Sequence, residues 1–254
     1  MDDMRFFAVA REIIDRIEKT QADNLRRVAD LYARCIAADG LVHLWGAGHS
    51  AMGVQETFPR IGSIVGFHPL VELPVTYYTN VVGVSGLRQA LFLERVSGYA
   101  EAVLQNFEFG PNDCFVVISS TGINCVALEM ALGAKKRGMP VVAITSLAHQ
   151  ASTVSRHPSG KKLAEVADFV IDNCTPPGDA SIPVEGCDYP TSSTSSLAVI
   201  TIVQTLNAMV AERLVKMGHK PLILASPHFV ENEEESQRNI EEYYKEFRRR
   251  TRRL

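Results

Sequence analysis

The stretch "DCFVVISSTGINCVALEMALGAKKRGMPVVAIT", residues 113–145, decides the fold. It opens with a short apolar run, turns through hydroxyl residues and a glycine, and continues with apolar residues at helical spacing. The helix is stopped by Gly138-Met139-Pro140, and a second apolar run rich in β-branched residues follows. Strand, helix and strand in this order predict a βαβ unit, whose parallel strands are covered by helices on both faces.

The same alternation continues on both sides of this unit. Apolar runs at 41–45 and 167–172 predict two more strands, and helical spacing is found at 51–58, where Pro59 disturbs it, and at 87–107, where it breaks near Gly98. Residues 61–82 show neither a clear helical pattern nor a clear strand pattern. The chain is therefore expected to form an α/β domain with its ligand site at the carboxyl ends of the strands.

Long helices are predicted at both ends of the chain. Residues 4–38 predict one long helix or two in series, residues 197–217 a very apolar helix, and residues 235–248 a last amphipathic helix. Residues 173–196 are loop-rich and hold four prolines. We expect an N-terminal helical segment at 1–40, one ligand-binding domain at 41–220, and a C-terminal helical extension at 221–254.

The composition is that of an ordinary globular protein: 254 residues, 46% hydrophobic and 22% charged, with a net charge of −3. The five cysteines are odd in number and show no zinc spacing, so we expect reduced thiols, a cytoplasmic location, no metal and no cofactor. The N-terminus does not resemble a signal peptide. The most apolar stretch is interrupted by Gln204 and Asn207 and is short for a membrane span, so no membrane contact is expected.

A glycine turn, "GAGHS" at 46–50, follows the first predicted strand. Gly46, Gly48 and Ala51 satisfy G-x-G-x-x-A, the pattern of dinucleotide-binding folds, and Glu72 lies near the expected distance for a ribose-binding acid. The pattern is weak, because small residues are common at strand-to-helix turns. What the pattern does indicate is a backbone that a ligand can approach closely and a helix N-terminus that favours an anion.

Two further turns are rich in hydroxyl groups. The turn after the strand in 113–118 contains Ser119, Ser120, Thr121, Gly122 and Asn124, and a third cluster, "PTSSTSS" at 190–196, includes Ser192, Ser193 and Thr194 just before the apolar helix. A helix cap needs only one hydroxyl. Three such turns favour a phosphate held by hydroxyls and backbone N–H groups without a lysine. A dinucleotide-binding fold, which needs one glycine turn, stays only as a minor alternative.

These motifs resemble the SIS (sugar isomerase) domain, over roughly residues 41–215. "GAGHS" together with "ISSTGINCVALEMALGAKKRGMPVVAITS" is similar to phosphoheptose isomerases, and "TSLAHQ", "SRHPSGKKLAEVADFVIDN" and "PPGDA" are closer to stand-alone bacterial members of the family. The resemblance implies a five-stranded parallel sheet flanked by helices. It implies phosphate binding by Ser119, Ser120, Thr121, Gly122 and Asn124 with Ser50, and a weaker contribution from Gly48, Ser192, Ser193 and Thr194. It also implies a homodimer or homotetramer.

An aldose–ketose isomerase needs a base that moves a proton between C1 and C2 of the sugar, and an acid or base that opens the ring. The glutamate of the phosphoheptose isomerases would fall near Pro59 or Arg60, so this sequence departs from their pattern. Glu56, the only acid in this helix, is the expected base, and a solvated surface role is its alternative. His49, inside the first turn, is the expected partner.

Other acid/base candidates are weaker. His149 and His157 lie in loops, where a histidine more often orders its own loop, and His43 is expected in the core. Glu185 is a second carboxylate candidate, and Lys161 and Lys162 could neutralise a phosphate, although solvated lysines are the ordinary reading.

Two functions remain open: isomerisation of a phosphosugar, and binding or sensing of one without turnover. The arginine-rich end "RRRTRR" at 248–253 follows the acidic run "ENEEES", so the C-terminus is bipolar and no nucleic-acid partner is expected. The expected partners are a phosphorylated sugar and further copies of the chain.

Overall fold

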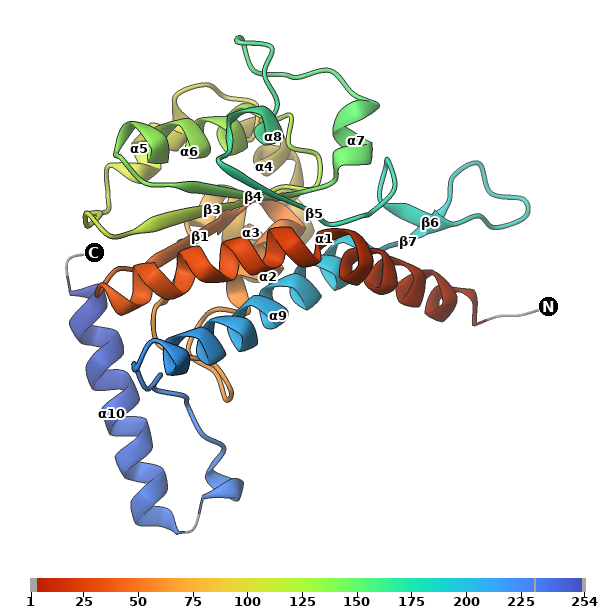
Figure 1. Cartoon of the computed structure of the whole chain (residues 1–254). Coiled ribbons are helices and arrows are strands. Elements are labelled where there is room, and N and C mark those ends of the chain that lie inside the picture. The colour runs from red at the N-terminus through yellow and green to blue at the C-terminus, as the bar shows by residue number, and fades with distance from the viewer. Residues whose placement is uncertain (1–3, 231, 253–254) are drawn as a thin grey trace.

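A computed structural model describes residues 4–230 and 232–252 of the chain. Its centre is a parallel sheet of order β2-β1-β3-β4-β5, which confirms the predicted five strands flanked by helices (Figure 1). The strands are β1 (Val42–Gly46), β2 (Phe67–Pro69), β3 (Cys114–Ile118), β4 (Val141–Thr145) and β5 (Phe169–Asp172). The register is regular: Leu44 pairs with Val116 of β3, and Val116 with Val142 of β4.

One face of the sheet is covered by two long helices, α1 (Arg5–Ala37) and α9 (Ser195–Lys216), and by the short α2 (Ala51–Gln55) (Figure 1). The N-terminal segment is thus one uninterrupted helix, because its apolar stripe at Ile13, Ile17, Leu25 and Val28 continues without a breaker. The two long helices pack against each other, and α1 also packs against β5. The N-terminal helix is therefore part of the main core.

The opposite face carries a second core built from the alternate residues of the strands. Trp45, Phe115 and Val117 pack there against the buried side of α6 (Cys125–Lys136). The other helices on this side are α4 (Leu87–Leu93), α5 (Tyr99–Leu104) and α8 (Leu163–Val166), with α7 (Leu147–Ala151) following β4 (Figure 1). Burial of the central strands on both faces explains their continuous apolar sequences.

The mixed segment 61–82 and its continuation contain several short elements. Besides β2 it holds a π-helical turn (Leu73–Tyr77), α3 (Tyr78–Val82) and a 3₁₀ turn (Gly83–Gly86) before α4 begins. A further 3₁₀ turn, Gly48–Ser50, precedes α2. The loop-rich region forms an antiparallel hairpin of β6 (Ala180–Ile182) and β7 (Thr191–Ser193), which projects from the body beside the start of α1 (Figure 1).

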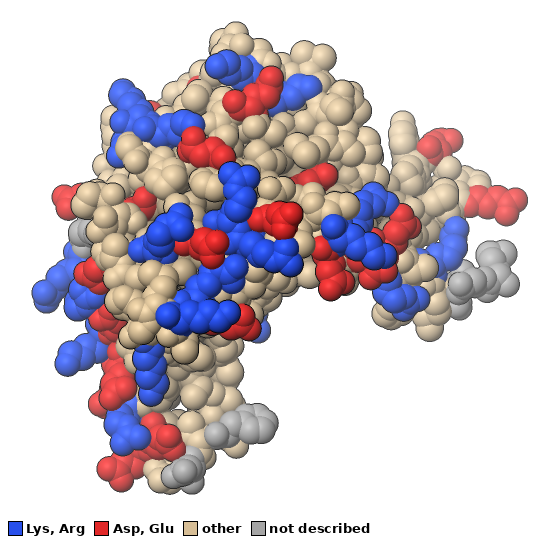
Figure 2. Space-filling model, in the orientation of Figure 1, with Lys and Arg blue, Asp and Glu red and all other residues tan. Residues whose placement is uncertain are grey.

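The C-terminal helix α10 (Glu233–Thr251), preceded by a 3₁₀ turn at Pro227–Phe229, extends away from the sheet (Figure 1). Tyr243 is buried and shares a hydrogen bond of 2.7 Å with Ser63. Arg250 donates to the main-chain oxygens of Ile36 and Gly40, and so caps the carboxyl end of α1. Basic and acidic side chains are interspersed over this face of the molecule (Figure 2).

By length and composition, α9 is the one described helix that could cross a membrane, a test that the core helices of soluble proteins also pass. In this structure one side of α9 is packed on the sheet and on α1. Its buried residues are Ala198, Val199, Ile202, Val203, Leu206, Val210 and Leu214. Burial inside the same chain therefore explains the apolar character of one side of α9.

Candidate functional site

A cavity of about 280 Å³ lies at the carboxyl ends of β1 and β3. It brings together the first turn, the second turn and the start of α9, three segments that are far apart in the sequence. This is the place where parallel α/β sheets bind their ligands. The cavity is lined by Trp45, Ala47, Gly48, His49, Ser50, Tyr78, Leu87, Leu91, Glu94, Ser119, Ser120, Thr121, Asn124, Ala127, Arg156 and Ser195.

The first turn leaves β1 through Gly46 and forms a 3₁₀ turn before α2. Gly48 has a φ of +56°, a backbone conformation that glycine adopts at little cost. His49 and Ser50 follow it at the edge of the cavity, and the His49 side chain is exposed to solvent. The turn therefore presents an imidazole and a hydroxyl to the same space.

The second turn is fixed by its own side chains. The N–H of Gly122 donates to Ser119 Oγ at 3.1 Å, and Asn173 Nδ2 donates to Ser120 Oγ at 2.9 Å. Gly122 has a φ of +59°, and a Cβ added there would lie 2.0 Å from Gln150 Nε2. Glycine is thus required for two independent reasons, conformation and space.

The hydroxyl hydrogens of these turns are available to a ligand. Ser119 Oγ and Ser120 Oγ act as acceptors, and the hydroxyls of Ser50 and Thr121 make no hydrogen bond within the described ranges. The indole Nε1 of Trp45 is buried and also lacks an acceptor there. Because buried donors are nearly always paired, this nitrogen marks a place for an acceptor atom of water or ligand.

The third hydroxyl cluster has a different place. Asp179 Oδ1 accepts the N–H groups of Thr194 and Ser195 at 2.9 and 2.7 Å, and its Oδ2 accepts the Ser195 hydroxyl at 2.6 Å. Neither Ser192, Ser193 nor Thr194 lines the cavity, whereas Ser195 does. The cluster binds the hairpin to the positive end of α9, an arrangement that a carboxylate favours.

Two charged residues of the cavity, Glu94 and Arg156, were not expected from the sequence. The amide of Asn124 bridges them. Asn124 Nδ2 donates to Glu94 Oε2 at 2.6 Å, and Arg156 Nη1 donates to Asn124 Oδ1 at 2.8 Å. Burial raises the pKa of Glu94, although the hydrogen bond from Asn124 and the charges of Arg156 and Arg95 act in the opposite direction. The site thus holds the cation of Arg156 and the carboxyl group of Glu94, whose pKa is raised.

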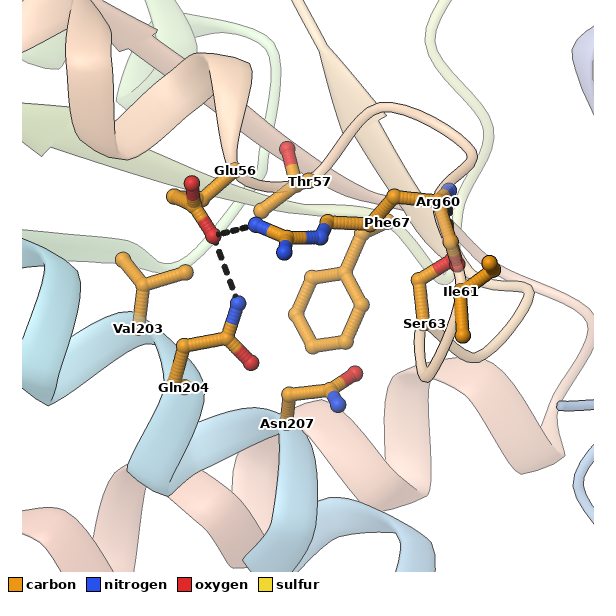
Figure 3. Close-up of a pocket in the computed structure, with 9 residues that line it drawn as sticks. All are labelled: Glu56, Thr57, Arg60, Ile61, Ser63, Phe67, Val203, Gln204 and Asn207. Carbon is orange, nitrogen blue, oxygen red and sulfur yellow. Dashed lines mark hydrogen bonds and ion pairs between the residues drawn. The ribbon is translucent and has the colours of Figure 1, made fainter. Parts of the chain in front are cut away.

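Glu56 lies in a different hollow, between the end of α2 and α9 (Figure 3). Its Oε2 accepts hydrogen bonds from Arg60 and, at 2.6 Å, from Gln204 Nε2. The hollow measures about 20 Å³, room for one or two water molecules, and no residue of the two glycine turns lines it. The structure therefore does not bring Glu56 together with the hydroxyl turns inside this chain.

The weaker candidates order their own surroundings. His149 Nδ1 accepts the N–H of Gly178 at 3.1 Å, and His157 contacts Ser159 and lies 3.6 Å from Glu129. Burial lowers the pKa of His149.

The remaining candidates also have local roles. Glu72, the acid of the dinucleotide pattern, accepts backbone N–H groups at the start of a helical turn and the hydroxyl of Tyr99. Glu185 is exposed in the hairpin loop, and Lys162 Nζ donates to the main-chain oxygen of Gln150. Within the residues that the structure describes, no three His, Cys, Asp or Glu side chains are grouped as metal ligands.

The structure is an α/β domain with a cavity at its topological switch point, between β1 and β3. The sequence model of the SIS domain family matches residues 5–146, more than half of the chain, and the chain belongs to this family. It is 34% identical over 242 residues to a UPF0309 protein of Geobacillus sp. (strain WCH70), with 94% of each chain covered.

Solved structures share the fold. The phosphoheptose isomerase of Neisseria gonorrhoeae aligns with a TM-score of 0.50 and 18% identity, over 81% of this chain and 96% of that one. A phosphoheptose isomerase from Francisella tularensis aligns with a TM-score of 0.51 and 15% identity, over 82% and 95% of the two chains. The predicted SIS domain is thereby confirmed.

Proposed function

We propose that the cavity binds the phosphate of a phosphorylated sugar and that the protein isomerises this sugar between its aldose and ketose forms. The observation that carries the binding is the convergence of Ser50, Ser119, Ser120 and Thr121 on one cavity, with hydroxyl hydrogens free to donate. The N-terminus of the 12-residue helix α6 adds a positive dipole. Gly122 and Asn124 belong to the same turn, and Gly48 allows close approach in the first.

The sugar would extend from these hydroxyls toward His49 and Glu94. His49 is the proposed acid/base partner, because it is the histidine that lines the cavity. The phosphoheptose isomerases that share the fold act on sugar phosphates, and this supports the substrate class. The protein is proposed to act in the cytoplasm as a homodimer or homotetramer, without a cofactor, metal, nucleic acid or membrane.

The binding site is tested with a double variant, Ser119→Ala with Thr121→Ala. Hydrogen bonds to a charged group are worth about 1.5–3 kcal/mol each, so the affinity for a sugar phosphate should fall at least about tenfold. A thermal-shift panel of hexose 6-phosphates, amino-hexose 6-phosphates and heptose 7-phosphates identifies a ligand, and calorimetry measures its affinity. Thr191→Ala, an exposed hydroxyl outside the cavity, is the matched control. An unchanged affinity in the double variant refutes the assignment.

Turnover is tested separately from binding. Exchange of the sugar's C2 proton with deuterated water, followed by NMR, is expected for any ligand that the protein isomerises. A ligand that binds through the hydroxyl turns without exchanging supports the second function, sensing of a phosphosugar without turnover.

A further inference from the structure

The carboxyl group of Glu94 lies between the two glycine turns. Glu94 follows α4, and its main-chain oxygen accepts the N–H of Val126 in the first turn of α6 at 3.1 Å. On the other side, the point where a Cβ of Gly48 would lie is 3.8 Å from Glu94 Oε1. The residue is thus anchored to the second turn through its backbone and adjoins the first turn with its side chain.

The two carboxyl oxygens have different surroundings. Oε2 is held by Asn124 Nδ2, whose amide is itself fixed by Arg156. Oε1 accepts no hydrogen bond from the described part of the chain, and the residue lines the cavity. One oxygen therefore orients the carboxyl and the other is left for a ligand, the arrangement that a base needs in order to reach a substrate proton.

Glu94 is the single carboxylate among the cavity residues. Glu56, which the sequence favours, is held by Arg60 and Gln204 in a separate hollow. Glu72 caps a helical turn, and Asp179 caps α9. A base that moves protons between the two carbons of a sugar must contact that sugar, and the position of Glu94 meets this requirement together with His49.

We propose, on the basis of the proposed function, that Glu94 is the catalytic residue that carries the proton between C2 and C1 of the open-chain sugar. The carboxylate removes the C2 proton, the C2–H electron pair forms the C1=C2 bond, and the C1 oxygen takes a proton from His49. The carboxyl then returns its proton to C1, the C2 hydroxyl gives its proton back to His49, and the ketose results.

The surroundings of Glu94 suit this role. A carboxyl whose pKa is raised by burial is a stronger base than a solvated one, and it can hold the transferred proton for the second half of the reaction. Within the described residues Arg156 donates to Asn124 and forms no direct ion pair with Glu94, so the base is not neutralised by such a contact. Asn124 acts as a positioning residue.

The test compares Glu94→Gln with wild type. Glutamine keeps an oxygen that can accept from Asn124, so the affinity for the sugar phosphate identified in the panel should change less than about threefold. C2 proton exchange should fall about 10²–10⁴-fold, the usual loss for a general base. Glu108→Gln, an exposed glutamate on the loop before β3, is the control for the chemical change.

A pH profile provides a second readout. Exchange by wild type should rise with pH through the raised pKa of Glu94, since the ionised form is the base, and this rise should be absent from the residual rate of Glu94→Gln. If circular dichroism shows that this variant does not fold, Glu94→Asp replaces it. Glu94→Asp should exchange the proton more slowly than wild type, and its exchange rate should still rise with pH.

The outcomes separate the two proposals. If Glu94→Gln exchanges the C2 proton at the wild-type rate, the proposed role of Glu94 is overturned and the isomerase proposal stays intact. The same holds if a folded Glu94→Asp exchanges at the wild-type rate. Loss of exchange in Glu56→Gln with retention in Glu94→Gln would assign the base to Glu56. A wild-type protein that binds sugar phosphates and exchanges none refutes isomerisation itself, and with it the proton transfer by Glu94.

Discussion

Asp113 is a buried carboxylate directly before β3, and two of its partners, Leu41 and His43, are far from it in sequence. It accepts hydrogen bonds from the N–H groups of Leu41 and Gly110 at 2.8 and 2.6 Å, and its Oδ2 lies 2.9 Å from His43 Nε2. Burial alone would raise the pKa of Asp113, but the hydrogen bonds from His43, Gly110 and Leu41 together outweigh it and lower the pKa.

Asp113→Asn should therefore destabilise the protein at neutral pH by about 1.5–3 kcal/mol, because a hydrogen-bonded charge is lost in the core. A lowered carboxyl pKa contributes stability above the unfolded-state pKa of about 3.9, and this contribution is lost as the pH falls through the folded-state value. Urea unfolding at pH 7 and at pH 3.5 measures the effect. The difference between wild type and variant should shrink at the lower pH, and an equal difference at both pH values contradicts the electrostatic explanation.

For single residues, the sequence predicts the cavity residues that lie in the turns themselves. It does not predict the cavity residues that only the folded chain brings to those turns. Ser50, Ser119 and Thr121 lie within four residues of the end of a strand, so their position at the cavity can be predicted from the turn alone. Glu94 and Arg156 come from a helix end and a loop, and no spacing relates them to the turns.

Glu56 illustrates the opposite case. Its short sequence distance from Ser50 predicts a place in the same site. Six residues are about one and two-thirds helical turns, however, so a helix tends to direct these two side chains to different sides. In the structure the two line different hollows. Its catalytic role stays a prediction, which the Glu56→Gln measurement tests.

At the level of elements, the carboxylate of Asp179, which precedes β6, caps the N-terminus of α9. Asp179→Asn keeps the left-handed backbone conformation, φ +67°, which Asn also tolerates, but removes the charge at the positive end of the helix. We expect a loss of about 0.5–2 kcal/mol and a melting temperature lower by about 2–6 °C, since the cap and the helix dipole are weakened together.

Differential scanning calorimetry measures this effect, with Asp188→Asn in the exposed hairpin loop as control. The variant should also bind the sugar phosphate more weakly, because Ser195 lines the cavity and is held by Asp179. An unchanged melting temperature would show that the charge of Asp179 contributes little, because asparagine keeps an oxygen that can accept the two backbone N–H groups.

The elements themselves were predictable where their periodicity is long. The helices α1, α6, α9 and α10 and the strands β1, β3, β4 and β5 follow directly from spacing. The edge strand β2 and the strands β6 and β7 of the hairpin have three residues each, too few for a periodic pattern.

At the level of the whole molecule, residues 197–203 are apolar on nearly every side of the helix, and a sheet covers only one face, so the sequence predicts an oligomer formed through α9. The structure shows one side of α9 covered by α1, while Ala208 remains exposed on it. If α9 forms the interface, Ala208→Arg should weaken association, because an unpaired charge is costly at a buried contact.

Light scattering at micromolar concentration should give a dimer or tetramer for wild type and for the control Ala102→Arg, which lies on the exposed side of α5. A monomeric wild type contradicts the predicted oligomer. A full oligomer in Ala208→Arg would place the interface elsewhere, with the exposed apolar segment around α3 and α4 as the next surface to vary. Its most exposed side chains are Val81, Val84 and Phe92.

The pairing of α1 with α9 also governs how the chain folds during synthesis. Helix α1, with Ile13, Ile17 and Leu25 along its apolar stripe, leaves the ribosome well before its partner α9, which begins only at Ser195. At about 5–20 residues per second, translation of residues 38–194 takes roughly 8–30 s. During this interval the apolar stripe of α1 can pack on strands that are already made but not on α9, so it stays partly uncovered until residues 195–216 have been synthesised.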